Sequence, residues 1–179
     1  SQEMWEELFS IEQYVEMALQ FSRLSAKSTD FVIGEVSLDK VVREAIHKYA
    51  RLFVRKKIKL ELTSIDTQIL TDEKWLEFVI EQILSNAIKY TAGGTISVYL
   101  KEESEQETKE LVIEDTGIGI APEDLPRIFE KGYTGYNGHA DKRSTGIGLY
   151  LCRKIMRKLS HEITIESEIG VGTKVHLEM

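Results

Sequence analysis

Segments with helical periodicity are mixed with strand-like segments along this chain, and their order limits the folds that it can adopt. Apolar residues at helical spacing predict helices at residues 3–24, at 38–55, from Thr71 or Asp72 to about 91, and at 147–159. Alternating and β-prone stretches predict strands at 57–63, 95–103, 109–115, 161–167 and 172–178. This order predicts an α+β fold, a two-layer α/β sandwich with helices on one face of a mixed, mostly antiparallel sheet.

Polar and glycine-containing segments separate these elements. Residues 25–36 are expected to form a linker, and the acidic stretch 102–110 a solvated hairpin tip. Pro122 is expected to open a short helix that reaches Phe129. The glycine-rich, polar stretch 132–146 shows no periodicity and has the character of a mobile lid.

The composition excludes several classes of function. A formal net charge of −7 over 179 residues disfavours a nucleic acid or an anionic membrane surface as partner. The single cysteine, Cys152, excludes an internal disulfide and a cysteine-based zinc cluster. No apolar run approaches the roughly 20 residues that span a bilayer, and no signal peptide is recognisable. Because the chain opens at Ser1 rather than at a methionine, we expect it to be a piece of a longer protein.

The first predicted helix carries an apolar seam of the kind found in coiled coils. Its residues are spaced alternately four and three apart: Met4, Leu8, Ile11, Val15 and Ala18. A helix with this much apolar surface needs a partner. The partner is either another helix of the same domain or a second copy of the chain, and the pattern favours the second copy.

The third predicted helix ends in EQILSNAIKYT, residues 81–91, where polar side chains interrupt an apolar surface. Gln82, Asn86 and Lys89 are four and three residues apart and therefore share one face. A carboxamide oxygen can bind Mg²⁺, which prefers oxygen ligands, and a lysine one turn on can pair with phosphate. The alternative is the ordinary polar edge of an amphipathic helix.

A predicted strand runs into two acids and two glycines in LVIEDTGIGI, residues 111–120. Gly117 and Gly119 allow the backbone to turn tightly and to lie close to a ligand. The Asp115 carboxylate would repel a phosphate, but it can accept a hydrogen bond from the exocyclic amino group of adenine. Strand alternation directs Glu114 to the face opposite Asp115. The alternative is a strand that ends in a common aspartate–glycine turn.

Two further segments follow, RIFEKGYTG at 127–135 and STGIGLYL at 144–151. In the second, Gly146 and Gly148 precede a helix, so free backbone N–H groups can face an anion. A single pair of glycines is weak evidence for a phosphate site. The order and spacing of all four segments make the evidence stronger.

Together the four segments resemble the N, G1, F and G2 boxes of the ATP-binding domain of bacterial sensor histidine kinases. That domain belongs to a superfamily shared with DNA gyrase B, Hsp90 and MutL, which has the Bergerat-type ATP-binding fold. The resemblance covers a domain over residues 30–179. Residues 1–29 resemble the end of the dimerisation and phosphotransfer hairpin and its linker. Within the kinases, the sequence is similar to small membrane sensors that accompany peptide-antibiotic transporters.

The resemblance implies roles for residues at the phosphate end of the site. Asn86 would hold Mg²⁺ between the phosphates, and Lys89 would contact phosphate oxygens. Arg127 would reach toward the γ-phosphate. The return of the lid and further phosphate contacts would come from Thr145, Gly146 and Gly148.

The resemblance also implies roles at the base end. Asp115 would accept from the adenine amino group, and Phe129 would anchor the lid. The walls and edges of the pocket would come from Tyr90, Gly117, Gly119 and Leu149.

Two departures from the family pattern matter. The phospho-accepting histidine motif is missing, because no histidine has the expected acidic neighbour and downstream Thr-Pro; the four are His47, His139, His161 and His176. In addition, Gln82 occupies the position where hydrolysing relatives place a glutamate as general base, and glutamine cannot act as one. Glu81 is adjacent but points about 100° around the helix.

The expected function is therefore that of a protein-histidine kinase, which transfers the ATP γ-phosphoryl group to a histidine for relay to a response regulator. ATP and Mg²⁺ are the expected ligands, and a homodimer through the first helix is the expected assembly of the whole protein. We expect the chain to be the cytoplasmic portion of a bacterial membrane sensor. As an isolated fragment, it is expected not to phosphorylate itself. The alternatives are an ATPase of the gyrase or Hsp90 type and a non-catalytic nucleotide-binding regulatory module.

Overall fold

The structure is a computed structural model, and it describes residues 1–26, 30–101, 107–135 and 146–179. The chain divides into two compact units, Ser1–Phe31 and Val32–Met179.

The first unit contains one long helix, α1 (Gln2–Ser25). The Ser1 side chain caps it by accepting a hydrogen bond from the Met4 N–H at 3.3 Å. The rings of Trp5 and Phe9 stack at 5.1 Å between centroids. The seam residues are exposed along the helix: Met4, Leu8, Ile11 and Val15 are 55–59% accessible, and Ala18 is exposed. The predicted helix is thus confirmed.

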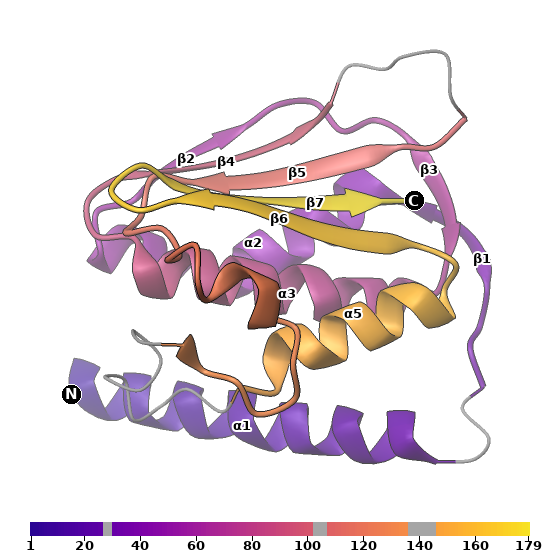
Figure 1. Cartoon of the computed structure of the whole chain (residues 1–179), viewed down its shortest axis with the longest axis horizontal. Coiled ribbons are helices and arrows are strands. Elements are labelled where there is room, and N and C mark those ends of the chain that lie inside the picture. Colours follow the sequence, from indigo (N-terminus) through magenta and orange to yellow (C-terminus); the bar gives the residue numbers. More distant parts are fainter. Residues whose placement is uncertain (27–29, 102–106, 136–145) are drawn as a thin grey trace. The chain divides into compact units, whose positions relative to one another are not determined.

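The second unit is built on a five-stranded sheet, which Figure 1 shows above its helices. The strands are β2 (Lys59–Leu62), β4 (Thr95–Leu100), β5 (Glu110–Asp115), β6 (Glu162–Glu168) and β7 (Gly172–Glu178), in the order β2-β4-β5-β7-β6. β2 and β4 run parallel, and the other three neighbouring pairs run antiparallel. The prediction of a mixed, mostly antiparallel sheet is confirmed.

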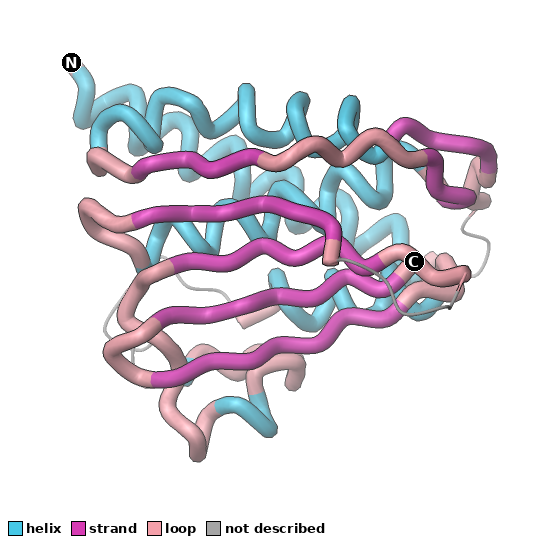
Figure 2. The backbone as a smooth tube through the Cα atoms, turned by 90° about the horizontal axis from the view of Figure 1, so that it is seen from above, coloured by secondary structure: helices cyan, strands magenta, loops and turns pink. Residues whose placement is uncertain are grey.

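Three helices cover one face of this sheet, and Figure 2 shows them behind the strands. They are α2 (Leu38–Arg55), α3 (Glu73–Tyr90) and α5 (Gly148–Lys158). α3 lies at the centre of the core, and most of its side chains are buried. Apolar residues of the five-stranded sheet form the other side of the core, and seven of them are at most 1% exposed: Ile96, Val98, Leu111, Val112, Ile113, Ile163 and Leu177. The fold is the predicted two-layer α/β sandwich.

Local side-chain chemistry sets the ends of α2 and α3. Ser37 caps α2 by accepting from the Lys40 N–H at 3.3 Å. Asp72 caps α3 by accepting from the Trp75 N–H at 3.1 Å. At the other end of α3, the Lys56 ammonium donates to the Lys89 carbonyl at 3.1 Å, which satisfies an orphan carbonyl of the last turn. The position of the helix end matters because the candidate site begins there.

Two short strands were not predicted. β1 (Gly34–Ser37) lies within the expected linker, and it pairs antiparallel with β3 (Gln68–Thr71) in a separate two-stranded sheet. Their sequences lack an apolar–polar alternation, because GEVS has one large apolar residue and QILT places its two side by side.

The predicted short helix from Pro122 to Phe129 is wrong. The structure has turns at this place and a single 3-10 turn, η1 (Leu125–Arg127). Pro126 has no N–H to donate to a carbonyl in the preceding turn, so a regular α-helix cannot continue through it.

Candidate functional site

The end of β5 places a carboxylate in the interior of the sandwich. Asp115 is 8% exposed, and its Oδ1 accepts a hydrogen bond from the Gly117 N–H at 2.9 Å. Burial raises the pKa of this carboxyl, and the backbone N–H groups of Gly117 and Thr173 partly oppose that shift. The carboxylate still has lone pairs for further donors. This position therefore suits a ligand that donates hydrogen bonds.

The loop after Asp115 packs against the end of α3. The Ile118 N–H donates to the Tyr90 carbonyl at 3.1 Å. A Cβ placed on Gly117 would lie 2.4 Å from the Tyr90 carbonyl oxygen and 2.9 Å from Asp115 Oδ1. Glycine at this position is thus required by the chain's own backbone.

The same loop also packs against the β6–β7 turn. Gly119 has φ +76°, and a Cβ there would lie 2.1 Å from the Glu168 carbonyl oxygen. The Ile120 N–H donates to Ser167 Oγ at 2.8 Å, and this hydroxyl lies 2.7 Å from Thr173 Oγ1. The loop that follows Asp115 is therefore held on two sides, and its second glycine also serves internal packing.

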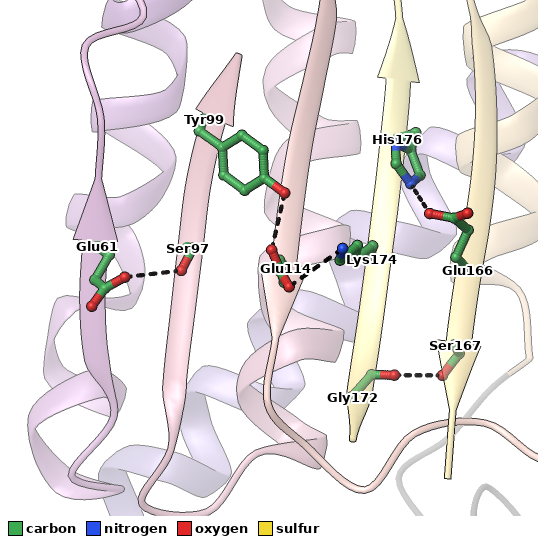
Figure 3. A network of polar contacts seen from close by, with 9 residues as sticks. All are labelled: Glu61, Ser97, Tyr99, Glu114, Glu166, Ser167, Gly172, Lys174 and His176. Carbon is green, nitrogen blue, oxygen red and sulfur yellow. Dashed lines mark hydrogen bonds and ion pairs between the residues drawn. The ribbon is translucent and has the colours of Figure 1, made fainter. Parts of the chain in front are cut away.

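Glu114 points to the other face of the sheet, as strand alternation predicts. The Tyr99 hydroxyl donates to its Oε2 at 2.9 Å, and Lys174 Nζ lies 3.7 Å from its Oε1. Figure 3 shows these side chains within a polar network on the strands. Burial, followed by the bond to Glu114, raises the pKa of Tyr99 to about 12. Only the second acid of the pair, Asp115, is buried on the helix side.

The polar face of α3 ends beside this loop. Asn86, Lys89 and Tyr90 are partly exposed, whereas Gln82 is buried at 8% exposure. The Lys89 ammonium lies 5.2 Å from the centroid of the Tyr90 ring. Since the Tyr90 carbonyl accepts a hydrogen bond from the loop after Asp115, the last turn of α3 lies next to the predicted base end. One helix end and one strand end thus bring together candidates that are far apart in the sequence.

Glu81 is occupied in a different contact. It is 6% exposed, and its Oε2 lies 2.9 Å from the Lys48 ammonium of α2. This partly buried ion pair joins α2 to α3. Glu81 is therefore a structural residue between two helices, and it does not replace the base that is missing at Gln82.

Arg127 is engaged within its own segment. Its guanidinium forms an ion pair with Glu130 at 3.1 Å and lies 4.3 Å from the centroid of the Tyr133 ring. The Tyr133 hydroxyl donates to Asp124. The hydrogen bond to Glu130 raises the pKa of Arg127 above its ordinary value. The predicted γ-phosphate ligand is thus held by an internal carboxylate here.

The segment between the third and fourth motifs is joined at its base. The Gly132 N–H donates to the Gly146 carbonyl at 2.9 Å. Gly146 has φ +69°, and a Cβ there would lie 2.5 Å from the Gly132 carbonyl carbon. Thr145 and most of the predicted lid lie outside the described residues.

α5 begins directly after this junction. Gly148 is its first residue, and Leu149, the predicted base-enclosing residue, is partly exposed. Ile147 occupies the cap position and has no side-chain acceptor for the first N–H groups of the helix. The free N–H groups expected from the second glycine pair are consistent with this helix start.

Phe129, the predicted lid anchor, packs toward α5. The Arg153 guanidinium lies 4.7 Å from the centroid of its ring. The two side chains line a shallow hollow together with Pro126, Glu130, Tyr150, Lys154 and Arg157.

Sequence reasoning did not single out Thr91 and Ser167. Ser167 ties the loop after Asp115 to the last two strands. Thr91 directly follows Tyr90, is 1% exposed, and is the C-cap of α3. A hydroxyl residue at the end of a motif-bearing helix was the available signal for Thr91. No local signal identifies Ser167, because its partner lies 47 residues earlier.

The described residues contain no group of three or more histidine, cysteine, aspartate or glutamate side chains that could hold a metal. Among the same residues, no helix is both long and apolar enough to cross a bilayer.

A helix-covered sheet with a buried carboxylate at the end of β5 and a docked glycine loop defines a class of ATP-binding domain. Residues 71–179 match the family described as histidine kinase-, DNA gyrase B- and HSP90-like ATPase. The chain belongs to this family. The match begins just before α3 and includes all four motifs.

Similar proteins are sensor kinases of bacteria. The sensor histidine kinase YxdK of Bacillus subtilis (strain 168) is 39% identical over 94% of this chain and 52% of its own length. Sensor protein BceS of the same organism is 35% identical over 93% of this chain and 49% of its own length. The chain spans about half the length of these relatives.

Solved structures agree on the fold. The mycobacterial sensor histidine kinase MprB superposes with a TM-score of 0.69 at 25% identity, over 83% of this chain and 97% of that one. Full-length ShkA in complex with AMPPNP gives a TM-score of 0.78 at 22% identity, over 96% of this chain and 36% of that one. These likenesses confirm the predicted sandwich fold.

Proposed function

We propose that this chain is the ATP-binding catalytic part of a sensor histidine kinase. The observation that carries the proposal is the buried Asp115 carboxylate beside a glycine loop that the chain's own backbone holds in place. An ionised carboxylate in this position gains from a donor, and the exocyclic amino group of adenine is one. The sensor kinase YxdK, at 39% identity, supports the same assignment.

In the proposed reaction the bond between the γ-phosphorus and its bridging oxygen breaks, and a bond to a histidine nitrogen forms. The chain's residues supply positioning and charge neutralisation, as is usual for phosphoryl transfer. Asp115 holds the base. Lys89 contacts phosphate oxygens, and Arg127 reaches the γ-phosphate after it leaves Glu130.

Asn86 suits a magnesium ion through its carboxamide oxygen. It is a partly exposed oxygen donor on the face of α3 that ends beside the site. Magnesium commonly retains waters and substrate phosphates as its other ligands, so one protein oxygen is enough. The ion would neutralise charge on the phosphates.

The remaining site residues belong to the same proposal. Tyr90 and Leu149 enclose the base, and Gly117 and Gly119 shape the loop beneath it. The junction of Gly132 and Gly146 closes the base of the lid. Further phosphate contacts come from Thr145 and from the α5 start at Gly148.

The acceptor histidine is proposed to lie outside this chain. His161 is buried, its Nε2 lies 2.9 Å from Thr71 Oγ1, and burial lowers its pKa. His176 lies between Glu110 and Glu166, at 2.9 and 2.8 Å. Both side chains are committed to the fold. These contacts, together with the missing acceptor motif, support a fragment that binds nucleotide without phosphorylating itself.

We further propose that α1 pairs with a second copy in the full-length protein. Its exposed seam supports this assembly. Residues 1–29 would then be the end of the dimerisation and phosphotransfer hairpin, and residues 30–179 the catalytic domain. The phosphoryl group would pass from the acceptor histidine to a response regulator, beneath the membrane in which the sensor is anchored.

A hydrolytic ATPase of the gyrase or Hsp90 type is the main rival. Gln82 and the engagement of Glu81 with Lys48 disfavour it, because neither side chain is available as a general base. Brisk ATP hydrolysis that Gln82→Ala abolishes would favour this rival.

The direct test is a calorimetric titration of the fragment with Mg·ATP. We expect saturable binding and, after incubation with labelled ATP, no acid-labile phosphate on the fragment. No binding at millimolar nucleotide would overturn the proposal and favour a regulatory module that has kept the fold but lost the nucleotide. Labelled fragment would show that the acceptor histidine is present in this chain.

A further inference from the structure

Thr91 has a buried hydroxyl group without a use in the fold. The residue is 1% exposed, and its Oγ1 has no hydrogen-bond partner among the residues that the structure describes. An unpaired buried hydroxyl costs free energy that threonine's isostere, valine, would avoid. The position therefore calls for a role beyond packing.

The direction of the side chain indicates that role. A Cβ placed on Gly94 would lie 3.1 Å from the Thr91 methyl carbon, so the methyl group faces Gly94. A Cβ placed on Gly117 would lie 2.9 Å from Thr91 Oγ1 and equally 2.9 Å from Asp115 Oδ1. The hydroxyl and the carboxylate thus converge on one point, which Gly117 keeps open.

The chemistry of the two groups is complementary. An ionised carboxylate only accepts hydrogen bonds, and a hydroxyl can donate one. The backbone N–H groups of Gly117 and Thr173 already act on Asp115, but burial still raises its pKa. A third donor would stabilise the charged carboxylate, which is the form that accepts from a base amino group.

We propose that Thr91 is a positioning residue for base recognition, whose hydroxyl donates to the Asp115 carboxylate when a purine with an amino group is bound. This inference rests on the proposed ATP-binding function. It adds a residue that acts through Asp115, and it predicts that the effect of Thr91 depends on the amino group of the base.

The test compares two nucleotides and three variants of the fragment by calorimetry. The nucleotides are ATP and purine riboside 5′-triphosphate, whose base lacks the amino group. Thr91→Val removes the hydroxyl and keeps the shape, and Thr91→Ser keeps the hydroxyl. Thr63→Val is the matched control, because Thr63 Oγ1 donates to the Val98 carbonyl outside the site.

We expect Thr91→Val to weaken ATP binding about three- to tenfold, the size of one hydrogen bond. It should leave the affinity for purine riboside triphosphate unchanged, and Thr91→Ser and Thr63→Val should bind both nucleotides as the wild type does. Thermal unfolding midpoints establish that each variant is folded.

Three results would overturn the inference. Equal losses for both nucleotides would mean that the hydroxyl serves the fold, for instance the Tyr90 carbonyl, which lies 2.4 Å from the same point. No loss for ATP, or a loss that Thr91→Ser does not restore, would also contradict it. Wild-type protein that binds neither nucleotide would instead refute the proposed function itself.

Discussion

The two ends of the candidate site differ in how completely the chain builds them. At the base end, Asp115 is 8% exposed, and its loop is hydrogen-bonded to the Tyr90 carbonyl and packs closely on the Glu168 backbone. At the phosphate end, Arg127 and Glu130 form an ion pair with each other, and their side chains are 55% and 53% exposed. The base end is held in place by the backbone. At the phosphate end, a phosphate must compete with the Glu130 carboxylate for an exposed arginine. Substitutions at the base end should therefore have larger effects than substitutions at the phosphate end.

The largest effect on nucleotide affinity should follow from removing the charge at the base end. Asp115→Asn replaces a carboxylate by an amide and loses a charge-assisted hydrogen bond to the base. We expect the dissociation constant for ATP to rise about 10- to 100-fold. Calorimetry measures this directly. An unchanged dissociation constant would remove Asp115 from the base site.

The second prediction concerns the rigidity of the base end. Gly119→Ala places a methyl group 2.1 Å from the Glu168 carbonyl oxygen at a φ of +76°. We expect the free energy of unfolding to fall by roughly 2–4 kcal/mol, from overpacking and left-handed strain together. Urea unfolding checks this value.

Gly34→Ala is the matched control for that experiment, since nothing lies within 4 Å of a Cβ there and φ is not positive. Similar unfolding curves for the two variants would mean that the loop yields easily. In that case the contrast in rigidity between the two ends would be lost.

A smaller effect is expected at the phosphate end. Glu130→Gln removes the carboxylate that competes for Arg127. Because exposed ion pairs contribute little, we expect ATP affinity to rise only about two- to fivefold and stability to stay nearly constant. In an Arg127→Ala background the gain should vanish. A gain that persists without Arg127 would show that Glu130 acts on the nucleotide directly.

The smallest effect is a change in stability without nucleotide. The pKa of Asp115 is raised in the folded state, chiefly by burial, so its ionised form costs stability. The contribution of Asp115 to stability is largest below its pKa in the unfolded state, and it is lost as pH rises through its pKa in the folded state. Asp115→Asn should therefore be more stable than wild type at neutral pH, and the difference should shrink as pH falls. Unfolding curves across pH test the sign, and a less stable variant at neutral pH would contradict it.

Local sequence signals predicted the main elements of the fold. The apolar spacing of α2 matched the observed Leu38–Arg55 closely, and the alternation around β5 separated Asp115 from Glu114 correctly. β1 and β3 could not be predicted in the same way, because they are stabilised by pairing with each other across 30 residues of chain. Pro126 was a local signal against the short helix near Phe129 that the prediction did not use.

The site was predicted in its residue types more than in its contacts. The reason for glycine at position 119 is a backbone carbonyl at Glu168, which no local pattern reveals. The pairing of Arg127 with Glu130 could have been predicted from their spacing of three residues. The orphan hydroxyl of Thr91 depends on burial from several elements, so it becomes visible only in three dimensions.

The account depends most on one claim, that the buried carboxylate of Asp115 receives the amino group of the base. Carboxyl-carbon NMR of the fragment can follow the pKa of Asp115 with and without saturating ATP. A donor to the charged carboxylate favours that form, so the pKa should fall when ATP binds. Purine riboside triphosphate should lower it less. A pKa that stays constant or rises in saturating ATP would contradict the claim.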